Sequence, residues 1–180
     1  MHSLATIVAR PIALGCLFFA CASPMTLSGQ AGPPSVPDPP RLEFVWEEIV
    51  TLGPSSPVGA TPQGKRNIVP ITGGTFAGPH IKGKILPGGW DWQLSTLGGC
   101  SSIHADYFLQ TDDGAIINVL NKGTMCMDSL GKPQRTLTTP VFEAPNGPYS
   151  WLNGGVYVGT IEGATVDGKP AVRIRFYQAV

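Results

Sequence analysis

The chain has 180 residues and no net charge, with 12 Lys and Arg against 12 Asp and Glu. This length suits one domain with a real core, and the charge balance argues against nucleic acid and anionic membrane surfaces as partners. Only 13% of residues are charged, whereas 23 Gly and 18 Pro approach a quarter of the chain, which favours many short strands and turns over helices.

The N-terminal segment has the pattern of an export signal. Residues 11–22, PIALGCLFFACA, form an apolar run about as long as a signal-peptide core and too short to span a bilayer. Small residues allow cleavage after Ala22 or after Ala31. We therefore expect residues 1–31 to be a signal peptide and the mature protein to be secreted or periplasmic, with no membrane contact once the signal is removed.

A proline-rich stretch separates this segment from the folded domain. Residues 32–40, GPPSVPDPP, can neither continue a helix nor pack a core, so we interpret them as a linker and the domain as residues 41–180. Lipidation at Cys21 is the less favoured alternative, because Phe18 stands where lipoprotein signals usually carry Leu.

The pattern from Arg41 onward is that of β-strands. β-Branched and aromatic segments alternate with Gly-rich turns, and no long segment has apolar residues at helical spacing between capping signals. The segments that predict strands are RLEFVWEEIVTL (41–52), NIVPI (67–71), GTFAGPHIKGKIL (74–86), SIHADYFLQ (102–110), AIINVLN (115–121), WLNGGVYVGTI (151–161) and AVRIRFYQAV (171–180). Because a closed barrel removes exposed edges, we predict a single antiparallel β-barrel, lipocalin-like in outline, with little helix.

One predicted hairpin also places two cysteines opposite each other. TDDGA, residues 111–115, predicts a turn at Asp113-Gly114, because these residues tolerate positive φ. With a three-residue loop, paired residue numbers sum to 226, and an unbroken register sets Cys100 opposite Cys126. In an exported protein this pair favours a disulfide; the alternative is two free, buried thiols. No cysteine or histidine spacing suggests a metal site.

Several motifs in order resemble those of a known family. They are RNIVPITGGTFAGPHIKGKILPGGWDWQL (66–94), ADYFLQTDDGAIINVLNKG (105–123) and PYSWLNGGVYVG (148–159). The chain from about Leu42 to Val180 resembles the domain of unknown function 3237 family, also called the UPF 0311 proteins. The resemblance implies one antiparallel β-barrel domain. Members mostly lack an assigned activity, and barrels of this outline are similar to small-molecule carriers and cofactor-free enzymes.

This chain departs from the family's pattern near the expected site. Where the family often reads Asp-Ala-Arg-Tyr, residues 104–107 read His-Ala-Asp-Tyr, and Trp90 stands where a small residue is common. If these positions line a pocket, the resemblance implies a ligand or a chemistry that differs from the family's typical case.

Strand alternation groups the candidate catalytic residues. Asp91 and Gln93 share one strand face, and His104 and Asp106 share a face of the next strand. If the paired numbers of these strands sum to an odd value near 199, Gln93 faces Asp106, and Lys122 joins the cluster opposite His104. His104 with Asp106 would then act as a base and its orienting group, and Asp91 as a carboxyl group whose acid form is favoured by apolar surroundings.

Two alternatives remain open for this region. An even sum would place Asp91 on the same face as Tyr107 and Asn121, and a single bulge is enough to reverse the parity. The polar residues would also be explained by a solvent-facing stripe, which is the default for an antiparallel sheet.

The arguments for the remaining candidate site residues are weaker. Arg66 would clamp an anionic ligand or be a solvated loop charge, and His80 lies between turn residues, where we expect it to be exposed. Trp151 and Asn153 would share a strand face and bind a flat ligand by stacking and hydrogen bonding. Alternatively, Trp151 belongs to the core and Asn153 caps a turn.

Three hypotheses follow for function. The leading one is a cofactor-independent enzyme of the isomerase, cyclase or lyase type, with Asp91, His104 and Asp106 as catalytic residues. Its substrate would be a small apolar, aromatic or carbonyl-bearing compound. The second is a carrier or sensor that binds such a ligand without chemistry, and the third is a module that forms a homo-oligomer through an apolar barrel face. The Gly-rich motifs lack the strand-turn-helix context of nucleotide sites, so no cofactor is expected.

Overall fold

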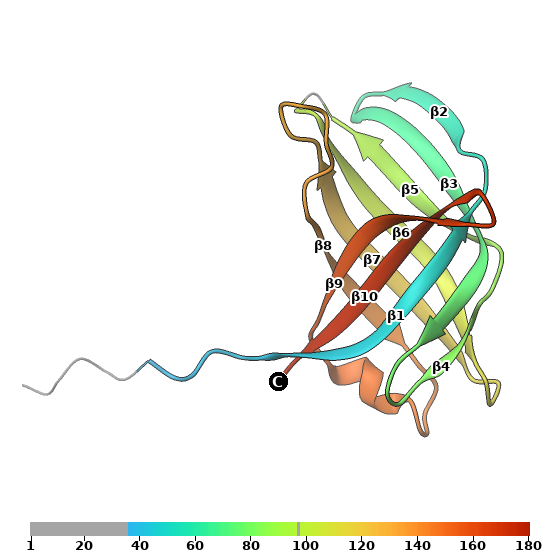
Figure 1. Ribbon diagram of the computed structural model, residues 1–180, viewed down its shortest axis with the longest axis vertical. Coiled ribbons are helices and arrows are strands. Elements are labelled where there is room, and N and C mark those ends of the chain that lie inside the picture. Colours follow the sequence, from blue (N-terminus) through green and yellow to red (C-terminus); the bar gives the residue numbers. More distant parts are fainter. Residues whose placement is uncertain (1–35, 97) are drawn as a thin grey trace, which may run out of the picture. The chain divides into compact units, whose positions relative to one another are not determined.

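Ten antiparallel strands and one short 3₁₀ helix make up the described part of the chain, residues 36–96 and 98–180, in this computed structural model (Figure 1). The signal peptide expected at residues 1–31 lies outside the described residues, as does the start of the linker. The elements are β1 (Leu42–Leu52), β2 (Ser56–Thr61), β3 (Gly64–Ala77), β4 (Lys82–Ile85), β5 (Gly89–Ser95), β6 (Cys100–Thr111), β7 (Ile116–Cys126), β8 (Thr136–Glu143), η1 (Ser150–Gly154), β9 (Tyr157–Val166) and β10 (Lys169–Ala179).

The sheet closes on itself, which confirms the predicted antiparallel β-barrel. β1 pairs with β10 on one side and with β3 on the other. The order around the ring is β1, β10, β9, β8, β7 and β6, then a position that β4 and β5 share, then β3. β2 forms a hairpin with β3 at one end of the barrel (Figure 1). Closure gives each strand of the ring, within the described residues, a neighbour on both sides over part of its length.

A glycine pair lets β3 change partners. β3 pairs with β5 up to Ile71 and with β4 from Gly74 onward, while β1 crosses its other side. Gly73 and Gly74 both have φ of +137°, which side chains rarely adopt. A Cβ on Gly74 would lie 2.0 Å from the carbonyl oxygen of Ile49 in β1. Glycine is therefore required where the barrel closes.

The predicted hairpin between β6 and β7 is confirmed over its whole length. Every pair from Gln110 with Ile116 to Cys100 with Cys126 sums to 226. Cys100 and Cys126 form a disulfide at the end of this register. A structural disulfide is consistent with an extracellular or periplasmic location, because such compartments are oxidising.

The two halves of the barrel interior differ. Toward the end that carries η1, aromatic rings fill the interior in tilted and edge-on contacts. The centroid of Phe142 lies 4.8 Å from those of Trp46 and Tyr157 and 5.3 Å from that of Phe176. This packed cluster closes one end, and aliphatic side chains line the other half.

The segment WLNGGVYVGTI was expected to be one strand, and this is wrong for its first part. Residues 150–154 form η1, and β9 begins only at Tyr157. The side chain of Asn153 accepts a hydrogen bond from the Ala144 N–H (2.8 Å) and donates one to the Ala144 carbonyl (3.0 Å). This amide satisfies the backbone after β8 as a partner strand would, so the chain can turn there.

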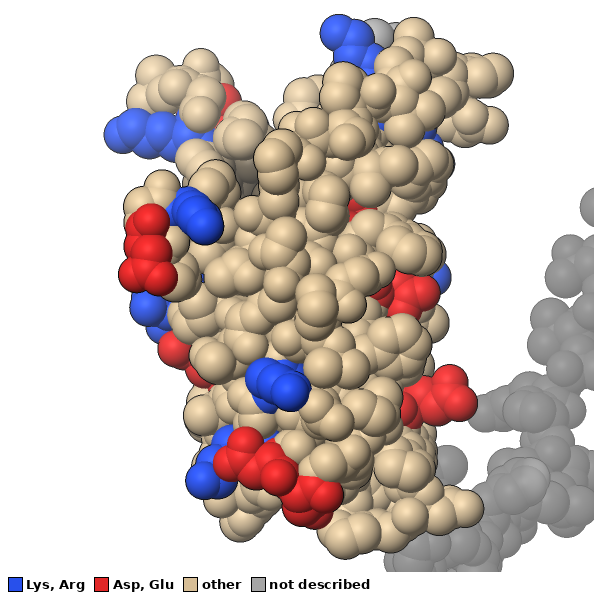
Figure 2. Space-filling model, turned by 90° about the vertical axis from the view of Figure 1, so that its right-hand side faces the viewer, with Lys and Arg blue, Asp and Glu red and all other residues tan. Residues whose placement is uncertain are grey.

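The barrel surface carries few charges. Figure 2 shows cationic and anionic side chains scattered over a mostly uncharged face. This face is hollowed at the β2 end, between two projecting groups of atoms. Within the described residues, no helix has the length and apolarity needed to cross a membrane, and no three His, Cys, Asp or Glu are grouped so as to hold a metal ion.

Candidate functional site

The half of the barrel away from the aromatic cluster encloses a cavity of about 210 Å³. Its wall is mostly aliphatic, and Asp91, Gln93 and Tyr107 are its polar members. The remaining lining residues are Val50, Leu52, Val69, Ile71, Ile103, Ala105, Met125, Ile161, Val172 and Ile174. Because pockets for drug-sized ligands span roughly 300–1,000 Å³, this cavity suits a small, mainly apolar organic molecule.

The register between β5 and β6 is even, so the odd register near 199 is wrong. Asp91 pairs with Ala105 and Trp90 with Asp106, and these numbers sum to 196. Asp91 therefore faces the barrel interior together with Tyr107 and Asn121, as the even alternative predicted. Gly89 lies opposite Tyr107, and a Cβ there would come within 2.5 Å of the Tyr107 Cβ. Gly89 thus leaves room for the tyrosine.

The even register separates the residues of the predicted acid-base cluster. Alternation turns the side chains of His104, Asp106 and Lys122 to the outer face, since Ile103, Ala105 and Tyr107 line the interior. Asp106 accepts a hydrogen bond from Asn118 (2.8 Å) on that outer face. The structure therefore does not bring the His104 imidazole or the Asp106 carboxylate to Asp91.

Asp91 is held by two donors. The Gln93 side chain donates to Oδ2 (2.7 Å), and the backbone N–H of His104 donates to Oδ1 (2.8 Å). Asn67 donates in turn to the Gln93 Oε1 (3.3 Å), which orients the amide. Burial raises the pKa of Asp91, and these two hydrogen bonds oppose the rise. The result is an oriented carboxyl group at an apolar cavity.

Asn121 supplies an unused hydrogen-bond acceptor to the same face. It lies two strands from Asp91, and Ala105 between them is small. Asn121 is only 2% exposed, and its Oδ1 has no hydrogen-bond partner among the described residues. A buried acceptor without a donor is unfavourable, but Asn121 is not among the residues that line the cavity.

Sequence reasoning missed a buried carboxyl group at the inner end of the cavity. Glu48 is fully buried, and it accepts hydrogen bonds from Trp46 Nε1 (2.9 Å) and from the Tyr107 hydroxyl (2.7 Å). Burial raises its pKa from 4.5 to about 7, although both hydrogen bonds oppose the rise. The signal was present in VWEEIV, because Glu48 shares a strand face with the apolar Trp46 and Val50.

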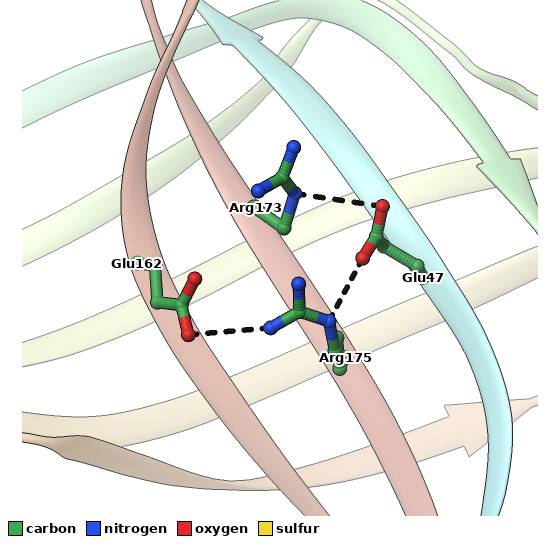
Figure 3. Close-up of polar contacts among 4 residues, drawn as sticks. All are labelled: Glu47, Glu162, Arg173 and Arg175. Atoms are coloured by element: carbon green, nitrogen blue, oxygen red, sulfur yellow. Dashed lines mark hydrogen bonds and ion pairs between the residues drawn. The ribbon is translucent and has the colours of Figure 1, made fainter.

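The adjacent Glu47 has the opposite environment. Figure 3 shows it on the outer face between Arg173 (3.5 Å) and Arg175 (2.8 Å), and Arg175 also contacts Glu162 (3.2 Å). Two successive glutamates thus point to opposite sides of β1. The outer one is ion-paired, whereas no Lys, Arg or His of the described chain forms a salt bridge with Glu48.

Three further predicted ligand-binding residues lie away from the cavity. The guanidinium of Arg66 stacks over the Trp92 ring on the outer face, 5.0 Å from its centroid. Trp151 and Asn153 belong to η1, at the opposite end of the barrel (Figure 1). They do not share a strand face, and the amide of Asn153 is occupied by the backbone of Ala144.

The barrel wall is open beside the cavity. β8 pairs with β9 only as far as the pair of Thr136 with Ile161, although β9 continues to Val166. A groove of about 670 Å³ lies here, and it shares Met125, Ile161 and Val172 with the cavity wall. The cavity and the groove thus meet across these three side chains.

The fold and the cavity define a class: an antiparallel β-barrel with an internal cavity. Within that class, the chain belongs to the family described as "Protein of unknown function (DUF3237)", whose profile matches residues 40–179. This confirms the family resemblance seen in the sequence motifs.

Relatives and a solved structure agree with this assignment. A UPF0311 protein of Rhodopseudomonas palustris (strain TIE-1) is 32% identical over 135 residues, which cover 67% of this chain and 88% of the relative. The "Hydroalkoxylation enzyme phnH" of Penicillium herquei is 31% identical over 128 residues, covering 70% and 77%. A β-barrel like protein from Acinetobacter baumannii AYE has a TM-score of 0.71 and 36% identity, covering 81% of this chain and 99% of that one.

Proposed function

We propose that this protein is a cofactor-independent enzyme that transfers protons on a small molecule held in the barrel cavity, with Asp91 as its acid-base group. The observation that carries the proposal is the position of Asp91, an oriented carboxyl group with a raised pKa in the wall of an apolar cavity. Partial desolvation of a carboxylate makes it a stronger base toward a bound substrate.

The named activity of one relative supports this class of chemistry. Hydroalkoxylation adds an alcohol O–H across a carbon-carbon double bond, so one proton leaves oxygen and one arrives at carbon. The fungal relative that carries this name is 31% identical. For this chain we propose the same broad type of step, an isomerisation, a cyclisation or an elimination, on an apolar, aromatic or carbonyl-bearing compound that reaches the cavity from the groove beside β9.

A carrier or sensor of a small hydrophobic ligand is the second candidate function. It is favoured by the mainly aliphatic wall and by the hydrogen bond that Gln93 already makes to Asp91. In a carrier these polar groups would orient the ligand, and no bond would change.

An elimination probe separates the two functions. A base that removes the ring proton of 5-nitrobenzisoxazole opens the ring to a coloured phenolate, and no cofactor is needed. We expect the wild-type protein to accelerate this reaction, and Asp91→Asn to lower the rate roughly a hundredfold while leaving binding, measured by calorimetry, largely intact. Asp106→Asn is the matched control, because its carboxylate is on the outer face. Equal rates for wild type and Asp91→Asn would refute the proposed enzymatic function.

We also propose that the mature protein is secreted or periplasmic. The Cys100–Cys126 disulfide supports this location. Expression with its native N-terminus, followed by cell fractionation and thiol labelling, tests it: the exported fraction should contain no free thiol.

A further inference from the structure

The Tyr107 side chain crosses the barrel. β6, which carries Tyr107, and β1, which carries Glu48, are not neighbours in the ring, because β3 and the position shared by β4 and β5 lie between them. The 2.7 Å hydrogen bond from the Tyr107 hydroxyl to Glu48 therefore spans the interior. Both residues are at most 1% exposed, so this bond forms without competing solvent.

The hydrogen bond lies at the inner end of the cavity. Tyr107 lines the cavity, and so do Val50 and Ile174. Val50 follows Glu48 by two residues on the same strand face, and Ile174 is the direct partner of Glu48 in β10. The phenol hydroxyl donates to Glu48 in the resting protein. When a neutral Glu48 donates its own carboxyl proton to the phenol oxygen instead, the Tyr107 hydroxyl can donate to a ligand group.

The surroundings of Glu48 favour its neutral form. Its strand partners are Ile174 in β10 and Phe76 in β3, both apolar. Among described groups, Tyr107 is the titratable side chain that contacts Glu48, and the nearby charges of Arg173 and Arg175 are on the outer face (Figure 3). Without a cation, burial disfavours the carboxylate.

We propose that Glu48 and Tyr107 form a second proton-handling pair at the inner end of the cavity, which works together with Asp91. Tyr107 is the residue that touches the ligand, and Glu48 is a positioning residue that resupplies its proton. The inference rests on the proposed function, because it assigns a proton donor to the reaction that Asp91 begins as a base.

The step can be written for unsubstituted benzisoxazole, whose leaving oxygen is more basic than that of the nitro compound. The Asp91 carboxylate takes the ring proton, the C–H electrons form the nitrile, and the N–O bond breaks toward oxygen. That oxygen receives the hydroxyl proton of Tyr107, and Tyr107 takes the carboxyl proton of Glu48. Asp91 ends protonated and Glu48 ionised, and exchange with solvent restores both groups. Two carboxyl groups with different environments thus serve as base and as acid reservoir.

A titration tests the pair without a substrate. With glutamate ¹³C-labelled at its carboxyl carbon, NMR should show one resonance that titrates near pH 7, lost in Glu48→Gln and kept in Glu47→Gln. In Tyr107→Phe this resonance should titrate at a higher pH, because a hydrogen bond that favours the carboxylate is lost. A Glu48 resonance that titrates at an ordinary glutamate pH would overturn the proposal.

The pH profile of the elimination tests the role in chemistry. With unsubstituted benzisoxazole the rate should fall above about pH 7 as Glu48 ionises, and Glu48→Gln should remove this alkaline limb. Tyr107→Phe should slow unsubstituted benzisoxazole about tenfold more than the nitro compound, since the poorer leaving oxygen depends more on a proton donor.

The two proposals fail in different ways. If Asp91→Asn abolishes the reaction but the alkaline limb persists in Glu48→Gln, the proposed role of Glu48 and Tyr107 is wrong, whereas the proposed enzymatic function is retained. If Asp91→Asn has no effect on the rate, the proposed function itself fails.

Discussion

Glu48→Gln should change how the stability of the barrel depends on pH. The folded protein holds Glu48 with a pKa of about 7, against 4.5 ordinarily. Below about pH 4.5 the carboxyl group is neutral in both the folded and the unfolded chain. As pH rises toward 7, the carboxyl group ionises first in the unfolded chain, so the free energy of the unfolded chain falls relative to that of the folded chain. The free energy of unfolding therefore falls with rising pH, and the loss is complete above pH 7.

The size of the effect follows from the two pKa values. At about 1.4 kcal/mol for each pKa unit, a rise from 4.5 to about 7 corresponds to about 3 kcal/mol. This is a large fraction of the 5–15 kcal/mol that typically stabilises a domain. Gln cannot ionise, so the variant should gain about 3 kcal/mol relative to wild type between acidic and mildly alkaline pH. Its absolute stability depends separately on how well the amide satisfies Trp46 and Tyr107.

Urea unfolding with the disulfide intact measures this difference. Wild type, Glu48→Gln and Glu47→Gln would be compared from about pH 4 to pH 8, with coincident fluorescence and circular dichroism transitions as the test of two-state behaviour. Glu47 is partly exposed and ion-paired, so its substitution should cost at most about 1 kcal/mol. A wild-type minus Glu48→Gln difference that stays constant across this range would refute the reasoning, because it would mean that Glu48 titrates alike in the folded and unfolded chains.

Three further results are expected. Replacing both Cys100 and Cys126 with Ser removes a cross-link between residues 26 positions apart. The free energy of unfolding, measured with urea, should fall by about 3.5 kcal/mol, because the disulfide no longer restricts the unfolded chain. A decrease below about 1 kcal/mol would contradict this explanation. Val172→Trp fills the junction between groove and cavity, so calorimetric binding of 5-nitrobenzisoxazole should weaken at least about tenfold; unchanged affinity would exclude this access route. His104→Ala should retain the elimination rate that Asp91→Asn loses, because His104 holds Asp91 through its backbone N–H; a comparable loss would mean that the imidazole takes part.

Part of this structure could be predicted from the local sequence. The turn at Asp113-Gly114 joins β6 and β7 by a short loop, so the register of the whole hairpin, and with it the Cys100–Cys126 disulfide, could be predicted. Alternation in β5 also placed Asp91 and Gln93 on the face opposite to Trp90 and Trp92, since successive side chains point to opposite faces.

The candidate site could be predicted only in part. Asp91 and Gln93 were grouped correctly on one face, but the partners of that face depended on the parity of the pairing between β5 and β6. Glu48 was missed although it shares a strand face with Trp46 and Val50, because the local sequence does not show which side chain it contacts across the barrel. Its partner Tyr107 lies 59 residues away on a strand across the interior.

The two-residue period of an extended chain shows which side chains share a strand face, and residues that tolerate positive φ mark turns, so most strands and the β6–β7 turn could be predicted without a structure. Which face lies inside depends on how strands distant in sequence pair, and on closure of the ring where β1 meets β3. Closure turned Asp91, Tyr107 and Glu48 toward one cavity and left His104 and Asp106 on the outer surface.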